Sequence, residues 1–144
     1  MNITTTSANA TTKIGLKLAK KLKNGQIFAL YGDLGGGKTC FTKGLARGLG
    51  IKRRITSPTF VLMKVYNIKK GWLRHFCHVD AYRLKKPSDI IEVGLKEYLG
   101  RPDTVVAIEW ADKLKKILKP YKKTVIKFSF AGLHERKIQI KKSG

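Results

Sequence analysis

The segment Gly32-Asp33-Leu34-Gly35-Gly36-Gly37-Lys38-Thr39 matches the pattern G-x-x-x-x-G-K-[ST]. In this pattern the glycines allow backbone amides to surround a phosphate, the lysine adds a positive charge, and the hydroxyl reaches Mg²⁺. The pattern works only between a strand and a helix. It therefore restricts the chain to an α/β fold and predicts a site for ATP or GTP with magnesium.

The residues around this segment have the required pattern. An apolar run from Ile27 to Leu30 predicts a buried strand over residues 26–31. Residues 39–49 are helical in pattern and end at Gly50, and a first helix is expected over residues 7–23. The glycine-rich segment is therefore expected to lie between a strand and a helix.

The rest of the chain alternates strand and helix patterns without a linker or repeat. Residues 60–66 and 72–80 form a predicted hairpin with its turn at residues 69–71, and Ser88 caps a predicted helix running to Leu99. Further strands are expected over residues 103–110, 123–130 and 136–141, with a short helix ending at Leu118. We therefore predict a single P-loop domain over residues 1–144, with a mixed parallel and antiparallel sheet flanked by helices.

Two of the nine acidic residues stand at predicted strand ends, where a P-loop sheet presents its active site. Glu109 follows the run from Val105 to Ile108 and is favoured as the acid that holds Mg²⁺, which would leave Asp80 to orient the attacking water; the opposite division of the two roles stays open. His78 shares a strand face with Asp80 and is expected to orient it. The alternative for either acid is a helix cap or a lysine partner.

Two further features are candidates for the same site. The loop that contains Ser57 and Thr59 stands where switch-type loops meet the γ-phosphate, although Ser-Pro is also common in ordinary turns. Trp110 directly follows the expected metal acid, and packing in the core is the alternative to a contact with nucleotide or partner.

The chain of 144 residues carries a formal net charge of +22. Such charge attracts polyanions such as RNA, but a lysine-biased composition is the favoured explanation of it. No apolar run is long enough for a membrane span, and no secretory signal is expected. Cys40 and Cys77, without CxxC spacing, suit a reducing cytoplasm. A zinc site from His75, Cys77 and His78 is not expected, because no fourth ligand has suitable spacing.

Several motifs in order resemble the TsaE (YjeE) family of ATPases in bacterial tRNA threonylcarbamoyladenosine biosynthesis. The matching segments are Thr11 with Gly15, Leu30 to Gly35, Ser57 to Phe60, His78 to Leu84, Gly94 to Leu99 and Ile108 to Trp110. The resemblance spans nearly the whole chain. The sequence departs from the family pattern at Gly36, where alanine is common, and at Cys40, which stands where threonine is frequent.

The resemblance implies an ATPase that works with two proteins, TsaB and TsaD, in forming threonylcarbamoyladenosine at position 37 of tRNAs reading ANN codons. TsaD would perform the transfer, while ATP binding and hydrolysis would drive the cycling of the TsaB–TsaD complex. Direct contact with tRNA is left open. By the same resemblance, the phosphates would be held by Gly35, Gly36, Gly37 and Lys38, and Mg²⁺ would be held by Thr39 and Glu109. Asp80 would assist hydrolysis. Thr11, Cys40 and Arg136 would lie on the nucleotide side of the site.

Two other functions remain open on the sequence. The charge permits an RNA-binding module in which nucleotide only stabilises the fold. A small-molecule kinase is also possible, although no insertion is large enough for a lid and only seven arginines are present. Adenine is favoured over guanine because the chain lacks an Asn-Lys-x-Asp recognition loop.

Overall fold

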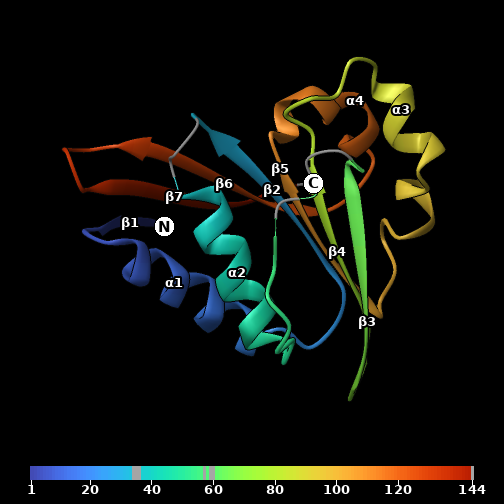
Figure 1. Ribbon diagram of the computed structural model, residues 1–144, viewed down its shortest axis with the longest axis horizontal. Coiled ribbons are helices and arrows are strands. Elements are labelled where there is room, and N and C mark those ends of the chain that lie inside the picture. Colours follow the sequence, from blue (N-terminus) through green and yellow to red (C-terminus); the bar gives the residue numbers. More distant parts are fainter. Residues whose placement is uncertain (34–36, 57, 59–60, 144) are drawn as a thin grey trace.

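A mixed β-sheet runs through the computed structural model, which describes residues 1–33, 37–56, 58 and 61–143 (Figure 1). Among these residues, seven strands lie in the order β1-β7-β6-β2-β5-β4-β3. Strands β6, β2, β5 and β4 are parallel, and the outer pairs are antiparallel. The strands are β1 (Asn2–Thr5), β2 (Gln26–Gly32), β3 (Met63–Lys70), β4 (Leu73–Asp80), β5 (Thr104–Glu109), β6 (Lys123–Phe130) and β7 (Arg136–Ser143).

Helices cover both faces of the sheet, as Figure 1 shows for α1 and α2 on one side and α3 and α4 on the other. Neighbouring residues of β2 alternate between the two cores: Phe28 packs with the α1–α2 layer and Ala29 with the α3–α4 layer. All six residues of β5 are buried, as expected for a parallel strand covered on both faces. The predicted fold class is confirmed.

Helix α2 has the predicted length, shifted by one residue, and the other helices are shorter than those that pattern alone predicts. They are α1 (Ala8–Lys20), α2 (Lys38–Gly48), α3 (Pro87–Glu92) and α4 (Lys115–Leu118), with 3₁₀ turns at η1 (Leu95–Glu97) and η2 (Ala111–Leu114). None of the helices in the described ranges is long and apolar enough to cross a membrane.

Helices α1 and α2 pack with their backbones almost touching. A Cβ atom added at Gly15 would lie 2.3 Å from the carbonyl oxygen of Phe41, and one added at Gly44 would lie 1.9 Å from that of Thr12. No side chain fits in either place without moving the helices apart. These glycines therefore set the close approach that fixes α2 against α1.

Three predictions about secondary structure are wrong in detail. The helix predicted from Ser88 to Leu99 breaks at Gly94, whose φ of +96° suits glycine, and it begins at Pro87 rather than after Ser88. The hairpin turn lies at Gly71 and Trp72, because β3 continues through Lys70. The edge strand β1 was not predicted at all; Phe60, the expected start of β3, lies outside the described residues.

Candidate functional site

Three parallel strands bring the candidate residues together at one edge of the sheet. Strand β4 ends at Asp80 and β5 ends at Glu109, and the two acids are register partners. Leu30, near the end of β2, pairs with Glu109 from the other side. Because the carboxyl ends of parallel strands share one edge, both acids face the start of α2.

The start of α2 depends on the backbone of Gly37. This residue has a φ of +104°, which only glycine adopts readily, and a Cβ atom there would lie 3.2 Å from Cγ2 of Thr11. The amides that follow are the unpaired donors of an eleven-residue helix. The turn thus places positive partial charge where a phosphate is expected.

Lys38 is 4% exposed, and its ammonium group is held inside the site. Nζ donates hydrogen bonds to the carbonyl oxygens of Gly32 at 2.6 Å and Asp33 at 2.8 Å. It also lies 4.2 Å from the ring centroid of Trp110. Burial lowers the pKa of Lys38, and the nearby carboxylate of Glu109 opposes that shift. The side chain is thus a desolvated cation in a preformed position.

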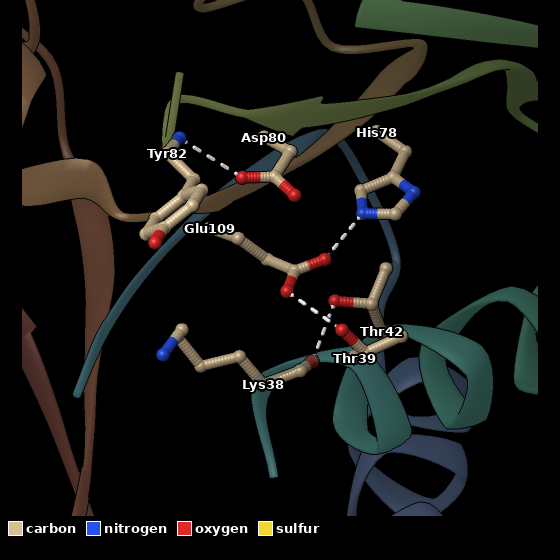
Figure 2. A network of polar contacts seen from close by, with 7 residues as sticks. All are labelled: Lys38, Thr39, Thr42, His78, Asp80, Tyr82 and Glu109. Carbon is tan, nitrogen blue, oxygen red and sulfur yellow. Dashed lines mark hydrogen bonds and ion pairs between the residues drawn. The ribbon is translucent and has the colours of Figure 1, made fainter. Parts of the chain in front are cut away.

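Glu109 is the centre of a buried polar network (Figure 2). The Thr39 hydroxyl donates to Oε1 at 2.9 Å, and Nε2 of His78 lies 2.6 Å from Oε2. On the inner side, the Thr42 hydroxyl donates to the carbonyl oxygen of Lys38 at 2.9 Å. Both oxygens of the acid are therefore oriented, one toward α2 and one toward β4.

The expectation that His78 orients Asp80 is wrong, since the hydrogen-bond partner of His78 is Glu109. His78 pairs in register with Ala107, so Glu109 is its diagonal neighbour two residues further along β5. All three side chains share one sheet face, and His78 reaches across to the other strand. Nδ1 of His78 is buried and makes no hydrogen bond within the described residues.

Asp80 has a different environment from Glu109. It is half-buried, and Oδ1 accepts a hydrogen bond from the backbone amide of Tyr82 at 3.0 Å. Figure 2 shows its carboxylate above that of Glu109 and on the side of Tyr82. The two acids thus separate into a buried one beside α2 and a more accessible one beside the β4 end.

Trp110 adopts the left-handed conformation, with φ 59° and ψ 43°. Its ring contacts Tyr82, with centroids 5.1 Å apart, and covers the Lys38 ammonium. Lys113 adds a hydrogen bond to the carbonyl oxygen of Tyr82. Of the two roles open for Trp110, packing is present at the edge of the α3–α4 core, and contact with nucleotide or partner stays a prediction.

A cleft of about 360 Å³ opens beside this network. Its lining includes four residues that were predicted on the nucleotide side: Thr11, Gly37, Cys40 and Arg136. His134 also lines the cleft and was not predicted. The buried Thr11 hydroxyl pairs with that of Thr5 at 2.8 Å. The structure therefore gathers residues from α1, α2 and β7 around one cavity next to the predicted phosphate site.

Four of the predicted site residues lie outside the described residues: Gly35, Gly36, Ser57 and Thr59. Their roles stay predictions. Within the described part of the chain, His78 is the main site residue whose partner was misassigned. The period of two correctly placed it on the site face, but only the β4–β5 register identifies which acid it meets.

The oxygen atoms at the start of α2 suit Mg²⁺. Mg²⁺ prefers oxygen ligands, takes few from the protein and keeps several waters. Thr39 Oγ1 and Glu109 Oε1 already lie 2.9 Å apart, so both can point at one ion. The described residues contain no cluster of three or more His, Cys, Asp or Glu that would form a dedicated cage. The donor set thus fits an ion shared with a phosphate ligand.

Comparison with known proteins gives a consistent answer. The family model described as threonylcarbamoyl adenosine biosynthesis protein TsaE matches residues 5–138. A Treponema pallidum protein named tRNA threonylcarbamoyladenosine biosynthesis protein TsaE is 39% identical over 87% of this chain and 89% of its own. The Bacillus subtilis protein of that name is 40% identical over 93% of this chain and 80% of its own.

A solved structure agrees with these sequence relatives. The crystal structure of YdiB from Bacillus subtilis superposes with a TM-score of 0.80 at 36% sequence identity, covering all of this chain and 86% of that one. The family model and the relatives span both the glycine-rich segment and the two strand-end acids. The chain therefore belongs to the TsaE family, whose role is in tRNA threonylcarbamoyladenosine biosynthesis.

Proposed function

We propose that this protein binds ATP with Mg²⁺ and hydrolyses it to ADP and phosphate. The observation that carries the proposal is the arrangement of Lys38, Thr39 and Glu109 at the end of β2 and the start of α2. A buried cation, a hydroxyl and an oriented carboxylate are the groups that P-loop proteins use on a phosphate and its metal.

Each group has a separate task in the proposed reaction. Lys38 exchanges its two backbone carbonyl partners for phosphate oxygens, with the α2 amides aimed at the same group. Thr39 and Glu109 hold Mg²⁺, which neutralises charge on the phosphate oxygens when bound. Asp80, half-buried beside them, orients a water for attack on the γ-phosphorus. Water adds to phosphorus as the bond to ADP breaks.

The adenine and ribose are assigned to the cleft that Thr11, Cys40 and Arg136 line. This cleft opens next to Gly37, so a nucleotide with its phosphates at α2 would extend into it. Its volume of about 360 Å³ is in the lower range of small-ligand sites. The lining polar groups suit a nucleoside without requiring a separate lid.

We further propose that TsaB and TsaD are the partners and that the nucleotide cycle times their association. Membership of the TsaE family supports a place in the same modification of tRNA. Free phosphate as product would distinguish this function from a small-molecule kinase, which would transfer phosphate to an acceptor.

The test is phosphate release by the purified chain with TsaB, TsaD, ATP and Mg²⁺ present. Lys38→Ala is expected to lower the rate by about 100-fold or more, because a buried charge aimed at the transferred group is lost. Lys43→Ala removes the same charge one turn further along α2, away from this site, and should keep at least half the rate. Normal hydrolysis by Lys38→Ala would refute the site assignment.

A further inference from the structure

The far end of α2 carries a second cleft that the nucleotide site does not use. It has a volume of about 630 Å³. Five of its eight lining residues are cations from α2 and the loop after it: Lys43, Arg47, Lys52, Arg53 and Arg54. No acidic residue lines it, so this cavity has one sign of charge.

The sequence around the cleft contains no acidic residue that could offset the cleft cations. Between Asp33 and Asp80 there are ten lysines and arginines and no aspartate or glutamate. The ten cations in these 46 residues match the average of the chain, 31 in 144, so the stretch is set apart by its missing acids and not by extra cations. The stretch includes α2, the loop after it and most of the β3–β4 hairpin, so the cations that line the cleft have no acidic neighbour along this part of the chain.

The cleft also concentrates arginine, the residue best suited to phosphate. Three of the seven arginines of the chain line it. The guanidinium forms a planar fork that matches phosphate oxygens, whereas lysine acts as a point charge. Arg47, Arg53 and Arg54 are exposed, and none forms an ion pair within the described part of the chain.

Packing holds two of the surrounding cations in place. The Arg53 guanidinium lies 5.1 Å from the ring centroid of Tyr66, which is itself buried in the core. Lys70 reaches across Gly50, where an added Cβ atom would come within 2.9 Å of its Nζ. Because Gly50 has a φ of +91°, a glycine there serves both the backbone turn and this close approach.

The cleft is separate from the phosphate site. Helix α2 runs from the strand ends to the opposite end of the molecule (Figure 1). At 1.5 Å per residue, Lys38 and Arg47 are about 14 Å apart along the helix axis. A ligand in the cleft would therefore leave the nucleotide site accessible.

We propose that this basic cleft binds the phosphate backbone of tRNA directly. A concave, single-sign, arginine-rich surface fits a projecting phosphodiester chain better than it fits a flat bilayer. RNA is favoured over an acidic protein because the family acts in the modification of tRNA. The inference rests on family membership and does not require that the chain hydrolyse ATP.

The test is binding of a fluorescently labelled unmodified tRNA, measured by anisotropy at KCl concentrations from 50 to 200 mM, without ATP or partner proteins. The triple variant Arg47→Ala, Arg53→Ala, Arg54→Ala is compared with Lys13→Ala, Lys17→Ala, Lys20→Ala, which removes the same charge from exposed positions on α1. Both triples lower the net charge from +22 to +19.

The cleft triple should bind tRNA at least about 10-fold more weakly, and its slope of log K against log salt should fall by about 2 to 3. The α1 triple should change affinity less than about 3-fold. Equal losses in both triples, or no binding by the unmodified protein, would overturn the proposal. Tighter binding of polyglutamate or of vesicles rich in phosphatidylglycerol would overturn it in favour of another partner.

A measurement on the unmodified protein avoids any dependence on the variants. Bound tRNA should protect Arg47, Arg53 and Arg54 from phenylglyoxal but leave Arg101 reactive, since Arg101 lies outside the cleft. Protection of Arg101 alone would contradict the proposal. The cleft triple should still release phosphate from ATP with partners at the normal rate, so failure of RNA binding and failure of the ATPase proposal are distinguishable.

Discussion

The two ends of α2 carry positive charge in opposite ways. At the first turn, Lys38 is buried, has three defined contacts and lies beside the network of Glu109. At the last turn and beyond, Arg47, Arg53 and Arg54 are exposed and line an open cleft. One end concentrates its effect in a single oriented cation, and the other spreads it over several.

This difference predicts how each end responds to substitution. Removing one member of a buried set of hydrogen-bonded groups has a large free-energy cost, because its partners are left unpaired. Exposed cations act additively, are screened by salt and matter little one at a time. A single substitution at the first turn of α2 should therefore have a large effect, whereas the cleft at the last turn should respond only when several of its cations are replaced together.

The largest effect is expected from Glu109→Gln. The amide keeps the size of the side chain but loses the negative charge, so Mg²⁺-dependent phosphate release should fall about 100-fold or more. Glu92→Gln removes a charge from an exposed position on α3 and should have no effect. If Glu109→Gln needed no more Mg²⁺ for phosphate release than the unmodified protein, the contrast between the two ends of α2 would fail.

A smaller effect is expected from His78→Ala, because His78 positions the acid and does not itself contact the proposed metal. Loss of such a supporting hydrogen bond should raise the Mg²⁺ concentration for half-maximal rate by about 10-fold, with a smaller change at saturating Mg²⁺. His75→Ala, on the same strand but bonded to Asn67, is the matched control. Equal Mg²⁺ titrations for all three proteins would exclude a positioning role for His78.

The two cysteines sharpen the comparison between buried and accessible positions. Burial raises the pKa of Cys77 to about 12, so it should not react with iodoacetamide at pH 8. Cys40 is only half-buried and lines the nucleotide cleft, so it should be alkylated, and ATP should slow the reaction several-fold. Mass spectrometry of tryptic peptides locates the label. Faster alkylation of Cys77 than Cys40 would contradict the arrangement.

The smallest effect is expected at the exposed ion pair of Arg101 and Asp103, where two hydrogen bonds of 3.0 Å join the side chains. This pair lowers the pKa of Asp103 to about 2 from an ordinary 3.8. Its contribution is present above the ordinary pKa and is lost as pH falls through the lowered one. Asp103→Asn should therefore lower Tm by at most about 2 °C at pH 7.

That difference in Tm between Asp103→Asn and the unmodified protein should shrink below pH 4 and vanish only below pH 2. Thermal unfolding followed by circular dichroism across this range is the measurement. A Tm difference that grew toward acid pH would mean that the pair does not act through the ionised carboxylate.

Local patterns were enough to predict the central part of the site. The glycine-rich segment is one local motif, and the apolar run of β5 with its closing acid is another, with Glu109 70 residues after Thr39. Each motif was recognised from its own spacing, and the rule that parallel strands present their carboxyl ends at one edge placed Lys38, Thr39 and Glu109 together. The fold class followed from the alternation of strands and helices. These features depend on near neighbours along the chain.

The remaining features depend on contacts between distant segments. Strand β1 has only four residues and pairs with β7, which is more than 130 positions away, so nothing local marks it as a strand. The His78–Glu109 contact depends on the register of β4 and β5. The basic cleft is lined by residues 43–55 alone, but the contact that holds Arg53 comes from Tyr66 on β3.

The contact between Lys38 and Trp110 makes the site optically readable. The chain has two tryptophans, and Trp72 lies at the β3–β4 turn, so Trp72→Phe would leave Trp110 as a single emitter. An ammonium 4.2 Å from the indole centroid perturbs the excited state of that ring. When phosphates draw Lys38 away, the emission of Trp110 should shift, so the occupancy of the phosphate site could be followed by the intrinsic fluorescence of the protein.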